Sequence, residues 1–333
     1  MTGSIAIIGA GSWGTALGVV LASRFARIRL WAYETDLVER MAATRVNDVF
    51  LSGFHLPANV QPTSDLAFAL DGAEIVLGVM PSRFARRLYA AMLPHLKSEM
   101  RFVSATKGLE NGTLLRISEV AREVIRSRFQ PRIAVLSGPT FAKEVARGEP
   151  TALVISSEDQ ALAASIQREF SGPTFRLYTN DDPAGVEIGA ALKNTIAIGA
   201  GICQGLGLGN NSIAALITRG LAEITRLAVA MGGQTRTLSG LAGLGDLVLT
   251  CTGELSRNRS VGIQLAQGRK LAEIVSAMTM IAEGIETTSA AVDLAHKFSV
   301  DMPITTQMDS ILRGGRSPRE AIRELMDRTL KNE

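Results

Sequence analysis

Short apolar runs alternate with longer amphipathic stretches over the first half of the chain. The short runs are typical of buried strands, and the stretches have the period of helices. Strands that alternate with helices favour a mostly parallel sheet covered on both faces. Strands are predicted at residues 5–8, 28–32, 75–80, 102–105, 133–136, 151–156 and 175–178, and helices at residues such as 15–26, 81–93 and 114–126.

The pattern changes near residue 180. Asp181, Asp182 and Pro183 supply helix caps and a helix-starting proline. Helical patterns rich in Ala and Leu then continue to the end, without a convincing strand. We therefore predict two domains, an α/β domain over residues 1–180 and an all-helical domain over residues 181–333. An amphipathic helix over residues 317–331 would face either the core or a partner.

Composition places the chain among ordinary globular proteins. Hydrophobic residues make up 46% and charged residues 20% of 333 residues, so the core needs no disulfide or metal. The net charge is only +3 and the basic residues are scattered, which argues against nucleic acid. Cys203 and Cys251 form no metal or disulfide motif, which favours a reducing, cytoplasmic setting. The uncharged run at residues 5–23 lacks the basic start of a signal sequence, so membrane insertion is not expected.

A glycine-rich turn follows the first predicted strand. Gly9, Gly11 and Gly14 form a GxGxxG pattern between that strand and a helix. The first glycine permits a tight turn, the second lets the backbone approach a pyrophosphate, and the third lets the helix pack on the strand. The pyrophosphate would bind N–H groups at the helix start. The pattern predicts a Rossmann-like, doubly wound dinucleotide-binding domain, with a plain glycine turn as the alternative.

An acidic residue follows the second predicted strand. Glu34 would accept hydrogen bonds from the adenosine ribose and repel a 2′-phosphate, which favours NADH. Asp36 is the alternative acid, and a solvated loop carboxylate is the alternative role.

Two isolated charges mark the second half. Lys193 is the only charged residue between Glu187 and Arg219, and desolvation lowers a lysine pKa toward neutrality, which suits proton transfer. The alternative is a side chain that reaches the surface. Asp246 is the only charge in residues 239–253 and needs a partner, for which Lys193 is a candidate. A helix N-cap is the alternative role of Asp246.

Several loops add candidate ligand-binding groups. Lys107 follows the strand at residues 102–105, and residues 79–82 and 136–142 leave other strand ends. Ligands of open α/β sheets bind beyond such ends. Residues 256–259 concentrate donors, and an arginine can hold a phosphate bidentately. Ordinary surface loops are the alternative for each.

In this order, the motifs resemble NAD(P)-dependent glycerol-3-phosphate dehydrogenases of the bacterial type. The resemblance runs from residue 5 to about residue 309. It is carried by GAGSWGTAL (9–17), ATKGLE (105–110), LSGPTFAKEVARGEPTA (136–152), ALKN (191–194), GLAGLGDL (240–247) and SRNR (256–259). It implies reversible hydride transfer between NAD(P)H and dihydroxyacetone phosphate, giving sn-glycerol 3-phosphate for glycerophospholipid synthesis. It also implies a homodimer and a C-terminal domain like that of 6-phosphogluconate dehydrogenase.

The resemblance assigns roles to individual residues. Lys193 corresponds to the proton-transfer lysine and Lys107 to a lysine that contacts cofactor and substrate, with Asp246 as their catalytic companion. The implied substrate positions are Lys107, Gly138, Lys193, Asn194, Asp246, Thr250, Ser256, Arg257 and Asn258. With the glycine turn and Glu34, the cofactor positions are Gly9, Gly11, Ser12, Trp13, Gly14, Tyr33, Glu34, Lys107, Gly138, Thr140, Ala142, Arg257, Ile281 and Glu283. Tyr33 stands where many bacterial members have a basic residue, which argues against a preference for NADPH.

Two other functions fit parts of the pattern. A dehydrogenase of similar build could act on a 3-hydroxy acid or ketopantoate, and would not need the phosphate donors at residues 256–258. A dinucleotide-sensing protein without turnover would not need the isolated Lys193 and Asp246.

Overall fold

The computed structural model describes residues 3–278 and 282–329. The chain forms two compact units. The first comprises Met1–Glu110 and Leu115–Glu187, and the second comprises Asn111–Leu114 and Ile188–Glu333.

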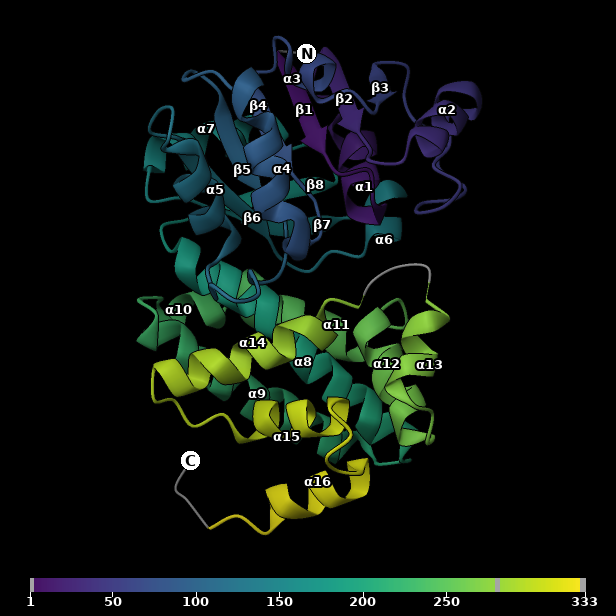
Figure 1. The fold of residues 1–333 in the computed structure, drawn as a ribbon, viewed down its shortest axis with the longest axis vertical. Helices are drawn as coiled ribbons and strands as arrows, with labels where there is room; N and C mark the ends of the chain where they lie inside the picture. Colours follow the sequence, from purple (N-terminus) through teal and green to yellow (C-terminus); the bar gives the residue numbers. More distant parts are fainter. Residues whose placement is uncertain (1–2, 279–281, 330–333) are drawn as a thin grey trace. The chain divides into compact units, whose positions relative to one another are not determined.

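An eight-stranded sheet forms the centre of the first unit (Figure 1). Its strand order is β3-β2-β1-β4-β5-β6-β7-β8, and each neighbouring pair is parallel except β6 with β7. The prediction of a mostly parallel sheet is confirmed. The strands are β1 (Ser4–Ile8), β2 (Arg27–Trp31), β3 (Val60–Thr63), β4 (Ile75–Gly78), β5 (Arg101–Ser104), β6 (Arg132–Ser137), β7 (Thr151–Ser156) and β8 (Phe175–Asn180).

Helices cover both faces of this sheet because its strands are apolar on both sides. Ile5 and Ile7 of β1 pack into one core with residues of α1, α2, α6 and α7. Ala6 and Ile8 point the other way, into a second core with α3, α4 and α5. The helices are α1 (Ser12–Leu21), α2 (Thr35–Thr44), α3 (Leu66–Leu70), α4 (Ala85–Met92), α5 (Ile117–Ile125), α6 (Ala142–Ala146) and α7 (Gln160–Phe170).

Two elements of the first unit differ from the sequence prediction. β3 was not predicted because it is short and contains Pro62. It lies at the sheet edge, where a strand tolerates the missing N–H of a proline. The helix predicted at residues 15–26 ends at Leu21, because the chain turns there and Ala26 donates its N–H to the carbonyl of Gly3 at 3.2 Å.

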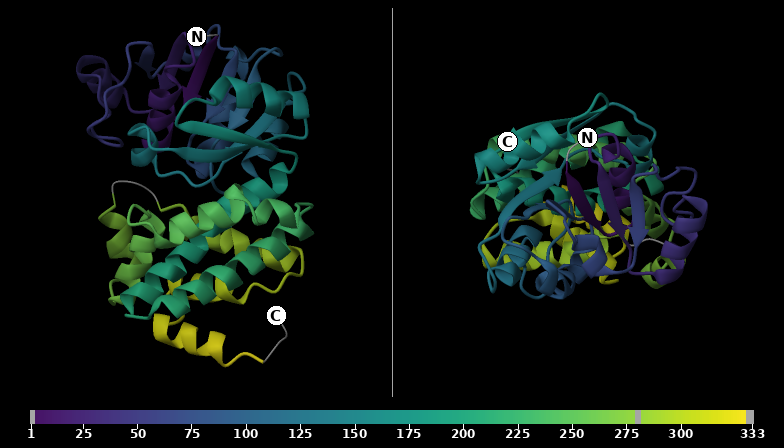
Figure 2. Two further views of the ribbon diagram at one scale, coloured as in Figure 1. Left: turned by 180° about the vertical axis from the view of Figure 1, so that it is seen from behind. Right: turned by 90° about the horizontal axis from the view of Figure 1, so that it is seen from above.

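The second unit is helical, as predicted, and no strand follows Asn180 among the described residues (Figure 2). Its first helix starts at Pro183, within the first unit, and continues into the second. The helices are α8 (Pro183–Gly205), α9 (Asn210–Ala230), α10 (Thr235–Leu238), α11 (Asp246–Thr252), α12 (Arg257–Ala266), α13 (Leu271–Ser276), α14 (Gly284–Lys297), α15 (Pro303–Leu312) and α16 (Pro318–Met326).

The backbones of α8 and α12 approach each other through glycines. A Cβ on Gly201 would lie 1.9 Å from the carbonyl oxygen of Arg259, and a Cβ on Gly262 would lie 2.0 Å from that of Ile198. α8 is also long and apolar enough, by length and composition, to cross a membrane, but its apolar window is entirely buried in the protein. Its composition is therefore that of a core helix.

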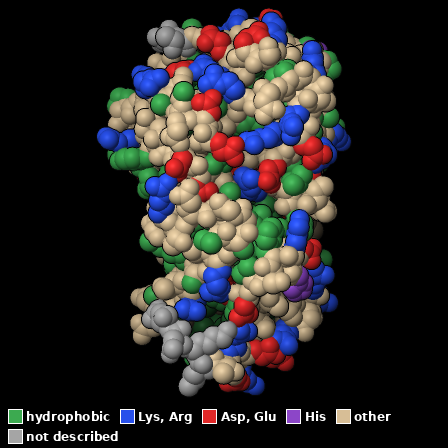
Figure 3. Space-filling view, turned by 90° about the vertical axis from the view of Figure 1, so that its left-hand side faces the viewer, with side chains coloured by type: hydrophobic (Ala, Val, Ile, Leu, Met, Phe, Trp, Pro, Cys, Tyr) green, Lys and Arg blue, Asp and Glu red, His purple; other side chains and the backbone are tan. Residues whose placement is uncertain are grey.

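The last helix packs on the core of its own unit. α16 begins at Pro318 with a capping box between Ser317 and Glu320. Ala321 is fully buried in the core of the second unit, so the helix packs on that core. The end of the predicted segment, residues 330–331, lies outside the described residues. On the face drawn in Figure 3, basic and acidic side chains are interspersed, as their scatter along the sequence suggested.

Candidate functional site

The glycine turn of the first unit connects β1 to α1. Gly9 has a φ of +121°, and a Cβ there would lie 2.5 Å from the carbonyl oxygen of Val79. A Cβ on Gly14 would lie 1.8 Å from the carbonyl oxygen of Gly9. At Gly11, the N-cap of α1, a Cβ would have no described atom within 4 Å. The first and third glycines are thus required by packing, while the second leaves open space at a helix N-terminus.

A loop that sequence reasoning missed supports this turn. Asn47 is fully buried, and its amide donates to the carbonyl of Ala10 and to the hydroxyl of Thr15, both at 2.8 Å. Ser12 donates its hydroxyl to the carbonyl of Phe50 at 2.7 Å. Asn47 lies in an irregular segment, and no motif or period in the sequence marks it.

The turn also fits a bound dinucleotide by its donors. The indole nitrogen of Trp13 is buried and has no hydrogen-bond partner within the described part of the chain. Buried polar groups are normally satisfied, so this donor is suited to a ligand. The N–H groups at the start of α1 and the open space over Gly11 are suited to a pyrophosphate.

The end of β2 presents Tyr33 and Glu34. Tyr33 is 68% exposed, and the guanidinium of Arg87 lies 5.8 Å from its ring centroid. Glu34 is the exposed N-cap of α2, without a side-chain capping bond among the described residues. The alternative acid, Asp36, instead pairs with Arg40 at 2.7 Å, a bond that lowers the pKa of its carboxyl. Both acids are exposed, and Asp36 differs from Glu34 in being paired with an arginine.

The loops that follow β5 and β6 meet at Lys107. Its ammonium donates to the carbonyl of Gly138 at 3.1 Å and to the hydroxyl of Thr140 at 3.2 Å. Gly138 has a φ of +144°, and a Cβ there would lie 3.0 Å from the Cα of Leu153, so the position requires glycine. Ala142 begins α6 directly afterwards. The loops after β5 and β6 are therefore in direct contact through Lys107.

In the second unit, the two isolated charges meet. The ammonium of Lys193, on α8, donates to the carboxylate of Asp246 and to the hydroxyl of Thr250, the latter at 2.9 Å. The Lys193 and Asp246 side chains are 7% and 0% exposed. The expected pairing is confirmed, whereas the alternatives of a surface lysine and of an N-cap aspartate are wrong.

The glycine-rich stretch before Asp246 explains how the two charges approach each other. A π-helical turn, Leu241–Gly245, precedes α11. A Cβ on Gly243 would lie 2.1 Å from the carbonyl oxygen of Leu238, and one on Gly189 of α8 would lie 3.0 Å from that of Ala242. Small residues thus let the start of α11 lie against α8. Cys251 is buried close to this pair, and burial raises the pKa of its thiol to about 12.

A second polar cluster lies one residue further along α8. Asn258 donates to the side-chain oxygen of Asn194 at 3.0 Å and accepts from the N–H of Gly284 at 3.0 Å. The hydroxyl of Ser256 caps α12 by accepting from the N–H of Arg259 at 3.3 Å.

Arg257 and Glu283 are two further predicted positions, and both lie at helix starts. Arg257 is exposed at the first residue of α12. Glu283 is the N-cap of α14. Desolvation lowers the pKa of Arg257, and the negative charge of Glu283 opposes that lowering. Ile281 lies outside the described residues.

The two units offer different chemistry. The first presents main-chain donors and an open helix N-terminus, which suit an anion. The second presents a buried ammonium held by a carboxylate and a hydroxyl, which can hydrogen-bond to a developing oxyanion and transfer a proton. Among the described residues, no group of three His, Cys, Asp or Glu side chains could hold a metal ion.

Comparisons with known proteins match both units. Family models described as the N-terminus and C-terminus of NAD-dependent glycerol-3-phosphate dehydrogenase match residues 4–163 and 182–323. The chain is 61% identical over 326 residues to an NAD(P)+ glycerol-3-phosphate dehydrogenase from Koribacter versatilis, with 97% of each chain covered. It is 52% identical to the corresponding protein of Geobacter sp. (strain M21), covering 100% of this chain and 99% of the relative. The crystal structure of glycerol-3-phosphate dehydrogenase from Coxiella burnetii matches with a TM-score of 0.94 at 41% identity, covering 98% of this chain and 99% of that one.

Proposed function

Because the chain belongs to the family of NAD-dependent glycerol-3-phosphate dehydrogenases, we propose that Lys193 is the proton donor and acceptor of its reaction. The chain is an NAD(P)-dependent oxidoreductase that interconverts dihydroxyacetone phosphate and sn-glycerol 3-phosphate. The observation that carries the proposal is the buried ammonium of Lys193, held by Asp246 and Thr250.

The proposed chemistry follows from the charge that develops on the substrate. When bound, the nicotinamide supplies or accepts the hydride. During reduction, negative charge grows on the C2 oxygen, and the Lys193 ammonium first hydrogen-bonds to that oxygen and then donates a proton. During oxidation, the neutral amine accepts the proton of the hydroxyl. Asp246 stabilises and orients the ammonium, and Lys107 adds positive charge toward both cofactor and substrate.

Cofactor binding is assigned to the domain predicted over residues 1–180. Gly9, Gly11 and Gly14 form its pyrophosphate turn, which Ser12 and Trp13 extend with side-chain donors. We assign further cofactor contacts to Tyr33, Lys107, Gly138, Thr140 and Ala142 of this domain, and to Arg257, Ile281 and Glu283 of the helical domain. Glu34 would bind the ribose hydroxyls, so we propose that NADH is used at least as well as NADPH.

Substrate binding is assigned to residues 181–333, with Lys107 and Gly138 from the first domain. Arg257 begins α12, and a helix N-terminus and a guanidinium both favour the substrate phosphate. Ser256, Asn258, Asn194 and Thr250 supply further polar contacts.

The cellular setting belongs to the same proposal. We place the enzyme in the cytoplasm as a homodimer without membrane insertion, where it supplies sn-glycerol 3-phosphate for glycerophospholipid synthesis. The buried thiols of Cys203 and Cys251 support a reducing compartment. Light scattering during gel filtration tests the dimer, and subcellular fractionation tests the location.

The decisive experiment is the Lys193→Met variant. It keeps much of the side-chain length but removes the charge, so kcat should fall by about 10²–10⁴-fold while NADH still binds. Lys297→Met, which removes an exposed lysine of α14, is the matched control and should keep the parent rate. A folded Lys193→Met protein that binds NADH and keeps kcat within a few-fold of the parent contradicts the proposal, and makes Lys107 the next candidate.

A further inference from the structure

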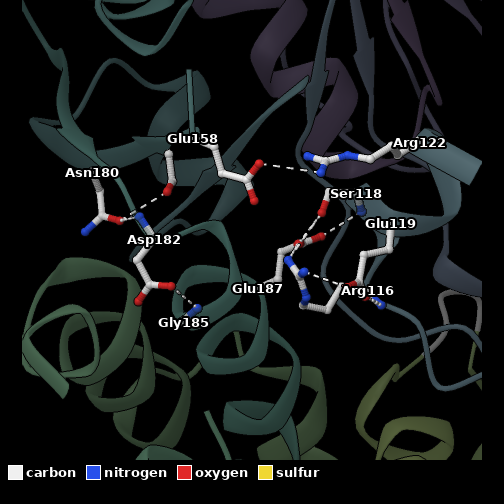
Figure 4. A network of polar contacts seen from close by, with 10 residues as sticks. Arg116, Ser118, Glu119, Arg122, Glu158, Asn180, Asp182, Gly185 and Glu187 are labelled. Atoms are coloured by element: carbon white, nitrogen blue, oxygen red, sulfur yellow. Dashed lines mark hydrogen bonds and ion pairs between the residues drawn. The ribbon is translucent and has the colours of Figure 1, made fainter. Parts of the chain in front are cut away.

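A buried carboxylate at the start of α8 has no role in the chemistry proposed above. Glu187 is only 3% exposed, and both of its oxygens accept hydrogen bonds (Figure 4). Oε1 accepts from the Ser118 N–H at 2.8 Å. Oε2 accepts from the Ser118 hydroxyl at 2.5 Å and from the Arg116 guanidinium at 2.9 Å. Buried carboxylates are costly unless satisfied in this way, so the Glu187 clasp (Glu187, Ser118 and Arg116) is a specific contact.

The clasp is built on the N-terminus of α5. Ser118 lies in the first turn of that helix, where N–H groups have no intrahelical acceptor. Arg116 is the N-cap, and it also binds Glu119 at 2.7 Å. The positive end of the helix favours a carboxylate. Burial raises the pKa of the Glu187 carboxyl, and the charge of Arg116 opposes that rise.

Further hydrogen bonds hold the same end of α8. Asp182 accepts from the N–H of Gly185 at 2.8 Å. Asn180, the last residue of β8, accepts from the Asp182 N–H at 2.7 Å and from the Ser156 hydroxyl of β7 at 3.1 Å (Figure 4). The first turn of α8 is therefore tied to α5, β7 and β8, all within the first unit.

The clasp lies where the chain passes from one unit to the other. These passages follow Glu110, Leu114 and Glu187, so Arg116 and Glu187 are close to them in sequence. α8 continues without a break to Gly205. It carries Lys193 six residues after Glu187, which is about 9 Å along the helix axis.

We propose that Glu187 is a positioning residue for the reaction, because it holds the start of the helix that carries Lys193. The inference rests on the proposed role of Lys193. The hydride comes from a cofactor bound by the first unit, and the proton comes from a lysine of the second, yet both must reach neighbouring atoms of one substrate. A displacement of about 1 Å can slow such a step by about 100-fold. α8 is anchored in the first unit and presents the proton donor in the second.

The test uses two buried glutamates that each accept hydrogen bonds from a main-chain N–H and a hydroxyl at the start of another helix. In the parent protein, both carboxylate oxygens of Glu187 accept hydrogen bonds. In Glu187→Gln, an amide N–H₂ replaces one of these oxygens, so a donor then faces a donor. Glu223 of α9 is the matched control. It is 2% exposed and accepts from the N–H groups of Ile304 and Thr305 and from the Thr305 hydroxyl. Glu223→Gln creates a similar conflict at the start of α15, without touching the bonds that hold the start of α8. Ser118→Ala removes one hydroxyl from the clasp and is expected to fold.

The first readout is the rate of hydride transfer in a single turnover. It should fall by about 10- to 100-fold in Glu187→Gln, and by a few-fold in Ser118→Ala, while the NADH Kd and the pKa values of the kcat–pH profile stay those of the parent. The double variant should be no slower than Glu187→Gln alone, since both changes break one clasp. Glu223→Gln should keep the parent rate.

The second readout is amide hydrogen exchange of the ligand-free protein. The amides in the first turns of α8 should exchange at least about tenfold faster in Glu187→Gln than in the parent. Their exchange rate should be unchanged in Glu223→Gln. A Glu187→Gln rate within threefold of the parent, or an equal loss in Glu223→Gln, overturns the inference. Hydrogen exchange needs no turnover, so it tests whether Glu187 anchors α8 separately from the role proposed for Lys193.

Discussion

The two units offer different kinds of chemical groups, main-chain N–H groups in the first and charged side chains in the second. In the first unit, the turn after β1 presents main-chain N–H groups. Its glycines keep side-chain atoms out of the turn. There is no room for a Cβ at Gly14, and the space next to Gly11 is open. In the second unit, the paired groups are the buried side chains of Lys193 and Asp246.

This difference determines how each region responds to substitution. A backbone site is damaged by adding atoms, because an added Cβ occupies the space of the ligand or of a neighbouring strand. A side-chain site is damaged by removing atoms, because the partner of a removed charge stays buried without compensation. The comparison can therefore be tested with two kinds of variant. One adds a methyl group in the first unit, and the other removes a charge in the second.

The largest effect is expected at the third glycine. In Gly14→Ala, the new Cβ would lie 1.8 Å from the Gly9 carbonyl oxygen, so α1 must move away from β1. We expect a loss of about 3 kcal/mol or more in unfolding free energy and at least a tenfold weaker NADH Kd. In Gly11→Ala, the Cβ meets no described atom within 4 Å, so the melting temperature should stay within about 2 °C while NADH binding still weakens about tenfold. Calorimetry and NADH fluorescence titration measure both. Normal NADH binding in both variants would contradict a backbone-built site.

A smaller loss is expected when the phosphate arginine is removed. Charge-assisted hydrogen bonds contribute about 1.5–3 kcal/mol, so Arg257→Ala should raise the KM for dihydroxyacetone phosphate by about 10- to 150-fold. The NADH Kd should change much less. Parallel assays with free dihydroxyacetone give the control, since that substrate has no phosphate to lose. If the parent enzyme reduces both compounds equally well, the phosphate site is misplaced and a 3-hydroxy-acid substrate becomes the better hypothesis.

Glu34 departs from the comparison, because the role proposed for it in the first unit is that of a side chain. Its carboxylate should repel a 2′-phosphate by about 1 kcal/mol, so Glu34→Gln should raise the NADPH/NADH ratio of kcat/KM by about fivefold. Asp36→Asn is the matched control and should leave the ratio unchanged, because Asp36 is already paired with Arg40. A parent enzyme that prefers NADPH a hundredfold would show that Glu34 does not face the ribose.

The smallest effect concerns the dryness of the second site. Burial raises the pKa of Cys251 to about 12. The thiolate is the reactive form, and it becomes scarcer as the pKa rises. Between about pH 7 and pH 10, an ordinary thiol becomes largely ionised, whereas Cys251 should stay protonated, so alkylation of the folded protein should remain slow. Mass spectrometry of peptides after iodoacetamide treatment, with the urea-unfolded protein as control, measures this. Rapid labelling of folded Cys251 would show that water reaches the site.

The features that the sequence predicted are those that leave a local pattern. The glycine turn was predictable because each glycine has a separate steric reason. The pairing of Lys193 with Asp246 was predictable because a lone charge in an apolar stretch must find a partner. The fold class followed from alternating strands and helices, and the change of pattern after Asn180 predicted the helical second half.

The features that were missed depend on contacts between distant segments. Asn47 supports the glycine turn from a loop without any period. In the sequence, Glu187 is only the last charge before the stretch that contains Lys193, but it binds a helix start about 70 residues earlier, at Ser118. β3 contains a proline that is compatible with a strand only at an edge, and its edge position follows from the complete sheet. No single segment carries the information for these contacts.

The order in which the protein is synthesised gives the close packing of α8 and α12 a further consequence. Gly201 of α8 leaves the ribosome 61 residues before Gly262 of α12, the helix whose backbone covers it. At about 5–20 residues per second, the nascent chain therefore carries α8 without its α12 partner for about 3–12 seconds. During that interval a helix with the apolar character of a membrane span lacks part of the core that buries it in the folded protein. We expect this to be the stage of biosynthesis at which the chain depends most on chaperones.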